Sequence, residues 1–255
     1  MFSEDFSAVG DAAAVKRDYL KKNPLGYFVL SVLAGMYIGF GVLLAFSIGG
    51  FLDGAPITKV VMGIAFGVAL SLVVICGAEL FTGSNLVMSA GVFQGKLSMV
   101  DAIKVWVVCW IGNAFGGVLL AVMYHFSGLG NGAAGEFMAN GVLAKISATG
   151  PELFVRGILC NILVCLAVWA TFRCKSEEGK LIMIFWCLFA FITTGFEHSV
   201  ANMTLFTVGL LRPCGLELTA GGCLYNLLFV TIGNMVGGIC FVSLPYFIAQ
   251  KGSKK

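Results

Sequence analysis

The sequence predicts an all-α integral membrane protein with six transmembrane helices, arranged as a 3+3 inverted repeat. Three observations lead to this fold class. The chain of 255 residues is 59% hydrophobic and only 11% charged, whereas soluble domains are roughly one-quarter charged. Six charge-poor stretches are each long enough to cross a bilayer, which takes about 20 apolar residues. Sequence markers of the first three stretches recur in the last three, about 120 residues later.

The six predicted spans form one transmembrane domain, 25–250. They are 26–52, 59–94, 102–126, 153–172, 181–210 and 218–249. The halves of the repeat cover about 25–127 and 150–250, and the connection between them is expected to be loop-like. Polar residues interrupt the second and fifth spans, while the other four are continuous.

The segment 1–24 is predicted to be an amphipathic helix that lies at the cytoplasmic membrane interface. Phe6, Val9, Ala13 and Leu20 recur at roughly helical spacing before the break at Asn23. The segment has many charges and lacks the apolar core of a cleavable signal peptide. A solvated polar tail is the alternative interpretation.

Lys and Arg are distributed unevenly over the connections, which predicts the orientation of the spans. Twelve of them precede span one, flank the second and fourth connections or end the chain, and four fall on the other side. Both termini, including a short tail at 251–255, are therefore predicted to be cytoplasmic, in the inner (plasma) membrane. The net charge of +3 reflects this topology and does not indicate a nucleic-acid partner, because basic and aromatic residues do not cluster.

The nine cysteines do not form a recognisable metal or disulfide pattern. Seven lie inside predicted spans, and the sequence contains no C-x-x-C pair. We interpret them as small packing residues, and we predict no metal site and no cofactor.

An internal repeat relates the two halves. "GAELFTGSN" at 77 matches "GFEHSVAN" at 195, "GNAFGG" at 112 matches "GNMVGG" at 233, and Gly35 is paired with Gly157. Because each half has three spans, the second half must enter the membrane in the opposite direction, as in the inverted repeats of many transporters. Paired glycines at G-x-x-x-G spacing within the spans predict close helix packing.

The polar interruptions predict two broken helices that face the protein interior. Unpaired backbone groups are too costly to expose to lipid. The helix that restarts after each break directs its N-terminal amides inward, which favours anions. Glu79, Glu197 and Asn202 are interpreted as structural at the breaks, the carboxylates accepting hydrogen bonds from the loosened backbone. Proton transfer or direct contact with a substrate is the alternative for the carboxylates.

Of the two histidines in the sequence, His125 falls at the end of the third span, whereas His198 lies well inside the fifth span, in the second break. A buried histidine is often a satisfied core residue, but one in a break whose charge can change near neutral pH favours a role in a pathway. Thr82 holds a corresponding place in the first break and supplies a hydroxyl donor.

"GAELFTG", "CNILVCLAVW" and "GFEHSVANMTLF", together with the two G-N-x-x-G-G motifs, closely resemble the formate/nitrite transporter family over nearly the whole chain. The overall sequence is most similar to the nitrite and hydrosulfide branches. The resemblance implies an aquaporin-like fold assembled as a homopentamer, with one pore in each protomer. The absence of an N-P-A signature argues against aquaporins themselves.

The resemblance also implies which residues form the pore, with two apolar slits around a central histidine. The histidine is His198, the facing threonine is Thr82, Lys145 attracts anions and Asn161 lies near the histidine. Lys145 as a solvated surface residue is the alternative. The residues implied at the constrictions are Phe66, Leu70, Leu80, Phe81 and Phe191.

The function that the resemblance implies is a membrane channel for small monovalent weak-acid anions, with hydrosulfide first and nitrite or formate next. Proton transfer from His198 would remove the charge of the anion in the apolar slits. A proton-coupled formate or nitrite transporter of the same fold is the alternative. An enzyme is not expected, because the spans offer no second histidine for a metal site and no evident catalytic triad. A purely structural protein would not need two broken helices.

Overall fold

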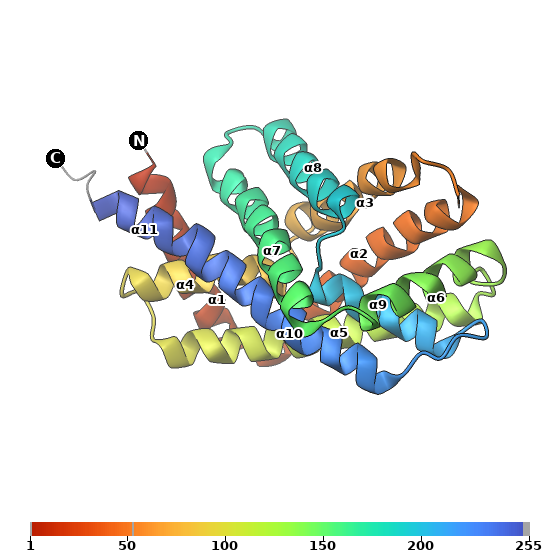
Figure 1. Cartoon of the computed structure of the whole chain (residues 1–255). Coiled ribbons are helices and arrows are strands. Elements are labelled where there is room, and N and C mark those ends of the chain that lie inside the picture. The colour runs from red at the N-terminus through yellow and green to blue at the C-terminus, as the bar shows by residue number, and fades with distance from the viewer. Residues whose placement is uncertain (1, 53, 252–255) are drawn as a thin grey trace.

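The computed structural model describes residues 2–52 and 54–251, and it is all-helical, as the sequence predicts (Figure 1). The described residues form α1 (Ser3–Lys22), α2 (Pro24–Phe51), α3 (Thr58–Ile75), α4 (Phe81–Phe93), α5 (Met99–Phe126), α6 (Ala133–Ile146), α7 (Gly150–Arg173), α8 (Glu177–Thr194), α9 (Ser199–Leu211), α10 (Ala220–Gly238), a π-helical turn η1 (Ile239–Ser243) and α11 (Leu244–Lys251).

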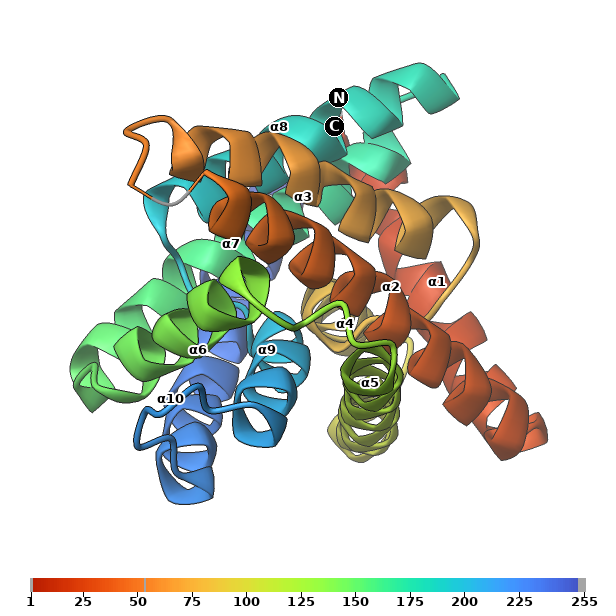
Figure 2. The ribbon, with the colours of Figure 1, turned by 90° about the vertical axis from the view of Figure 1, so that its right-hand side faces the viewer.

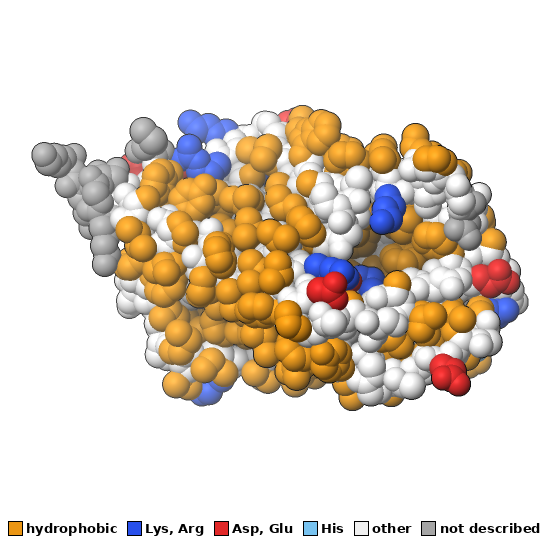
Figure 3. All heavy atoms as spheres, viewed as in Figure 1, with side chains coloured by type: hydrophobic (Ala, Val, Ile, Leu, Met, Phe, Trp, Pro, Cys, Tyr) orange, Lys and Arg blue, Asp and Glu red, His pale blue; other side chains and the backbone are white. Residues whose placement is uncertain are grey.

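Several helices are long and apolar enough to cross a membrane, so the chain is an integral membrane protein. By length and composition these are α2, α3, α5, α7 and the continuous stretch Ala220–Gln250. The pair α8 and α9 passes the same test together, with a bend of 53° between its members. Apolar side chains cover most of the face seen in Figure 3, and a few charged side chains lie around a hollow in it.

The arrangement of the helices places the breaks inside the bundle. The segment that joins α8 to α9 runs through the middle of the molecule (Figure 1). Helices α2 and α3 lie side by side in both views (Figures 1 and 2). Helix α1 contacts α11, so the two ends of the described chain lie close together.

Helix α1 is docked on the protein. Phe6 is buried, its ring lies 5.9 Å from that of Trp169, and its carbonyl accepts a hydrogen bond of 2.8 Å from Gln94. Lys96, after α4, binds Asp11 at 2.6 Å. The apolar side of α1 therefore packs against protein. Except for Lys251, which ends α11, the predicted tail at 251–255 lies outside the described residues.

Two features of the helices differ from the sequence prediction. The connection between the halves, expected to be loop-like, contains the 14-residue helix α6, whose Met138, Ala139 and Val142 are buried. Its two glycines and single acidic residue weaken the apolar pattern of this buried face in the sequence. The last span, expected to be continuous, contains the π-helical turn η1. This turn follows Gly237 and Gly238, residues with low helix propensity.

Glycines bring two pairs of long helices into backbone contact, in the same way in both halves. A Cβ atom on Gly116 of α5 would lie 1.9 Å from the carbonyl oxygen of Val32 on α2. A Cβ atom on Gly237 of α10 would lie 2.4 Å from the carbonyl oxygen of Ile158 on α7. Both distances are too short for any side chain, so glycine is required for these approaches.

Candidate functional site

The two breaks have the same backbone geometry. Helix α3 ends at Ile75 and α4 begins at Phe81, while α8 ends at Thr194 and α9 begins at Ser199. Each break contains a glycine in the left-handed region, Gly77 with φ +72° and Gly195 with φ +81°, a conformation that glycine adopts without steric cost. The residue directly before each new helix has an extended backbone.

Those preceding residues are Leu80 in the first break and His198 in the second. In the geometry of the repeat, His198 therefore corresponds to Leu80. The expectation that Thr82 holds the corresponding place is wrong, because Thr82 is the second residue of α4.

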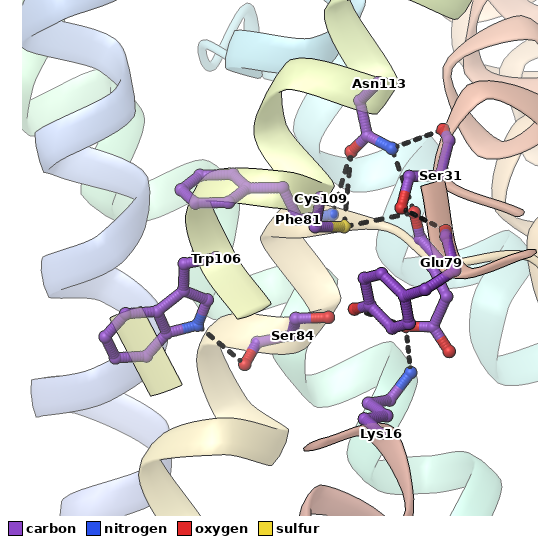
Figure 4. A network of polar contacts seen from close by, with 9 residues as sticks. Lys16, Ser31, Glu79, Phe81, Ser84, Trp106, Cys109 and Asn113 are labelled. Atoms are coloured by element: carbon purple, nitrogen blue, oxygen red, sulfur yellow. Dashed lines mark hydrogen bonds and ion pairs between the residues drawn. The ribbon is translucent and has the colours of Figure 1, made fainter. Parts of the chain in front are cut away.

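One asparagine holds each break together. The side-chain oxygen of Asn113 accepts from the backbone N–H of Phe81 at 2.9 Å, and its amide donates to the carbonyls of Ser31 and Glu79 (Figure 4). In the second break, the side-chain oxygen of Asn234 accepts from the backbone N–H of Ser199. The Asn234 amide donates to the carbonyls of Gly157 and Glu197. The loosened backbone is thus satisfied by side chains from α5 and α10.

Neither asparagine was predicted as a site residue, although both belong to the G-N-x-x-G-G motifs. The sequence signal was a polar amide at the same place in two apolar helices. The same contacts correct the repeat: Gly157 takes the place of Ser31, and its predicted pairing with Gly35 is shifted by one helical turn.

The carboxylate at each break is paired with a lysine. Glu79 accepts from Lys16 of α1 and from the hydroxyl of Tyr27 at 3.1 Å. Glu197 accepts from Lys145 of α6 at 2.8 Å and from the amide of Asn202 at 2.7 Å. The expectation that these carboxylates accept from backbone groups is wrong.

The lysines have two consequences for the site. Each carboxylate is compensated, so neither break presents an isolated negative charge to an anion. Lys145 is only 20% exposed, which argues against the solvated alternative. Lys16, its counterpart at the first break, was missed in the sequence because it lies in the charge-rich segment before the first span.

His198 connects the two breaks. Its Nε2 lies 2.9 Å from the Thr82 hydroxyl, and its Nδ1 accepts a hydrogen bond of 3.0 Å from the backbone N–H of Ala201. Because a backbone N–H can only donate, Nδ1 of the ring must be unprotonated. The neutral ring then carries its proton on Nε2 and donates it to Thr82. Charging the ring at Nδ1 would break this cap of α9.

Three cavities follow one another around the breaks. The α6-side cavity, of about 250 Å³, is lined by residues that include Lys145 and His198. The α1-side cavity, of about 240 Å³, is lined by residues that include Lys16 and Glu79. A central cavity of about 10 Å³ shares residues with both, and this volume is near the minimum for one water molecule.

Apolar side chains separate these cavities. Phe66 and Phe191 line both the α6-side and the central cavity, and their rings are 5.6 Å apart. Leu70 and Leu80 line both the α1-side and the central cavity. The ring of His198 stacks on Phe191 with a centroid distance of 5.9 Å. Four of the five side chains predicted at constrictions therefore lie between the cavities.

The remaining predicted residues lie elsewhere. Phe81 instead lines a groove of about 640 Å³ with residues of α5 and α10, such as Trp106 and Met235. Asn161 donates to the carbonyls of Thr82, at 3.3 Å, and Asn234. It thus lies behind Thr82 and supports the backbone there. Neither Phe81 nor Asn161 is among the described residues that line the three cavities at the breaks.

A family model described as "Formate/nitrite transporter" matches residues 4–248 of the chain. The chain belongs to the formate/nitrite transporter family. The proteins of this family that it resembles are channels and transporters for formate and nitrite, not enzymes. The match covers both breaks and every side chain described above.

Relatives and solved structures agree with this assignment. The nitrite transporter NirC of Salmonella typhimurium is 39% identical over 100% of this chain and 94% of its own length. A solved "FNT family ion channel" is 38% identical, with a TM-score of 0.92 over 97% of this chain and 99% of the other. A "Pentameric formate channel with formate bound" is 29% identical, with a TM-score of 0.79 over 90% and 98%.

Proposed function

We propose that the protein is a channel that passes small monovalent weak-acid anions, with nitrite as the first candidate. The observation that carries the proposal is a pair of lysine-lined cavities on either side of an apolar segment that contains His198. The ammonium groups of Lys16 and Lys145 offer N–H donors to an anion in the cavities. The apolar segment then selects what can cross.

The proposed topology has six spans, with α3–α4 and α8–α9 as the interrupted second and fifth helices of a 3+3 inverted repeat. The matching hydrogen bonds of Asn113 and Asn234 support this repeat. The excess of Lys and Arg on the side of the termini and of the second and fourth connections supports an orientation in the inner membrane. In this orientation α1 and the α1-side cavity face the cytoplasm. One transmembrane domain, 25–250, then follows the cytoplasmic helix α1.

A bare anion cannot cross the apolar segment easily. Removing a monovalent ion from water into an apolar environment costs many kcal/mol. A weak acid can lower this barrier by taking up a proton, whereas the anion of a strong acid cannot. The proposed permeating form in the apolar segment is therefore the protonated, neutral acid.

His198 acts in this proposal as a neutral hydrogen-bond donor and not as a stored source of protons. The hydrogen bond between Nδ1 and Ala201 supports the neutral ring. The proton that neutralises the anion comes from hydronium ions of the surrounding solution, which are left as water. This replaces the sequence-based hypothesis of direct proton transfer from the histidine.

The similarity to relatives sets the order of candidate substrates. High identity to a protein named as a nitrite transporter favours nitrite, and the solved formate channel favours formate next. Hydrosulfide, the first choice from the sequence, becomes the third. The pentameric formate channel also supports a homopentamer in the bilayer. A proton-coupled transporter of the same fold remains the second candidate, since permeation of a neutral acid moves a proton with each anion.

The role of His198 is tested by the pH dependence of nitrite uptake into proteoliposomes. His198→Asn keeps an oxygen that can cap α9 but cannot titrate. We expect it to transport more slowly than the wild type while its uptake still rises as the pH falls, because the weak acid itself takes up the proton. Loss of the pH dependence in His198→Asn would show that the histidine is the titrating group and contradict the proposal.

A further inference from the structure

Ser84 has a buried hydroxyl group that is left without a partner. The residue is 2% exposed, and its Oγ makes no hydrogen bond within residues 2–52 and 54–251. Its backbone groups are satisfied, since the N–H donates to Leu80 and the carbonyl accepts from the indole of Trp106 at 3.1 Å. A buried hydroxyl without a partner is costly, so a partner is expected in the space beside it.

That space is the α1-side cavity. Ser84 lines this cavity together with Lys16, Glu79 and Gly83. In Figure 4, Ser84 lies between Trp106 on one side and Glu79 and Lys16 on the other. Ser84 is also in the first turn of α4, where the helix dipole favours negative charge. A hydroxyl donor, an ammonium group and a helix N-terminus thus meet at one cavity.

The other half of the repeat lacks this arrangement. Asn202 holds the place of Ser84, since each is the fourth residue of its helix. The Asn202 amide donates to Glu197 at 2.7 Å and to Asn226 at 2.9 Å, so both of its N–H donors are used within the protein. The carboxylate of Glu79 is satisfied by Lys16 and Tyr27 instead. The Ser84 hydroxyl therefore has no protein partner among the described residues.

We propose that Ser84 is a specificity-determining residue that donates a hydrogen bond to an oxyanion held beside Lys16 in the α1-side cavity. The inference rests on the proposed function and adds a preference within it. Oxygen atoms of nitrite or formate accept such a bond well, whereas sulfur is a weak acceptor. A site built to hydrogen-bond its ligand discriminates against an analogue that cannot do so. Ser84 favours small carboxylates and oxyanions over hydrosulfide.

The test compares the half-saturating concentrations for flux of nitrite, formate and hydrosulfide in proteoliposomes. Ser84→Ala should raise those of nitrite and formate by about 2- to 10-fold, the equivalent of one hydrogen bond, and leave that of hydrosulfide unchanged. Ser84→Thr keeps the hydroxyl and should behave like the wild type. Ser89→Ala is the matched control, because the Ser89 hydroxyl lies on the same helix and donates to the backbone carbonyls of Asn85 and Leu86.

The outcomes separate this inference from the proposed function. If Ser84→Ala changes no half-saturating concentration, or raises that of hydrosulfide equally, the inference is overturned. If Ser84→Ala does not assemble, Ser84→Cys, which has only a weak S–H donor, should shift nitrite and formate in the same direction, and an unchanged value overturns the inference as well. Wild-type vesicles that pass none of the three anions would overturn the proposed function itself.

Discussion

At the scale of the residue, the charges inside the bundle occur in pairs. A buried carboxylate without a partner is strongly destabilising, whereas a compensated one is tolerated. Glu197 is 3% exposed and bonds Lys145, while Glu79 bonds Lys16. Each lysine comes from a helix that precedes its break in the chain. The pairs therefore attach α1 and α6 to the two breaks and place the ammonium donors of the lysines at the cavities.

Replacing Lys145 by Met should destabilise the protein, because it leaves Glu197 buried without a cation. We expect the free energy of unfolding to fall by an amount at the lower end of about 3–5 kcal/mol, since Lys145 is partly exposed. The measurement is the unfolding temperature in detergent, which should be lower than that of the wild type. The double variant K145M/E197Q should recover most of the loss.

The control for this prediction is Lys180→Met. Lys180 also forms an ion pair, of 2.7 Å, but its partner Glu177 is 66% exposed, and pairs of this kind contribute about 0–1 kcal/mol. Equal effects of the two lysine variants, or no recovery in the double variant, would argue against a buried compensated charge.

Site residues that place a polar group in an apolar span could be predicted from the sequence. Apolar site residues could not, because their role depends on the direction in which the side chain points. Glu79, Glu197 and His198 stand out against their surroundings. Leu80 and Phe81 are adjacent and equally apolar, yet one lines the central cavity and the other faces α5 and α10. That difference is set by the helix that starts between them.

At the scale of the element, the helix pairs α2–α5 and α7–α10 depend on glycine contacts. Gly116 and Gly237 each lie against a backbone carbonyl of the partner helix. A backbone atom cannot move aside as the end of a flexible side chain can. The two close pairs thus keep Asn113 and Asn234 at the distance from the breaks that their hydrogen bonds require.

Gly116→Ala should separate α2 from α5 and lower the unfolding temperature, at a cost of about 1–3 kcal/mol or more. Gly221→Ala is the matched control, because a Cβ atom there meets no atom within 4 Å. It should leave the unfolding temperature unchanged or slightly higher, since alanine favours helices. If Gly116→Ala proves as stable as Gly221→Ala, Gly116 is not needed for the close approach of α2 and α5.

The helical elements were largely predictable because span length and apolar composition are fixed by the bilayer. Helix α6 was not, since its buried face is made mostly of Ala, Gly and Met and carries a weak periodic signal. This helix matters for the site because Lys145 lies in its last turn. A pattern of apolar residues does not reveal a helix that packs through small side chains.

At the scale of the whole molecule, the two lysine-lined cavities and the apolar segment between them form one pathway in our proposal. The central cavity of about 10 Å³ is too small for a hydrated anion. Passage therefore requires loss of the hydration shell, and the cost of this loss depends on whether the anion can take up a proton. Nitrite and formate are anions of weak acids, whereas chloride is the anion of a strong acid.

The most direct test compares nitrite and chloride flux in the same proteoliposomes over a range of pH. The account predicts nitrite flux that rises as the pH falls, and chloride flux close to that of protein-free vesicles at every pH. Chloride flux as fast as nitrite flux, or nitrite flux independent of pH, would contradict the claim that the protein passes weak-acid anions with a proton.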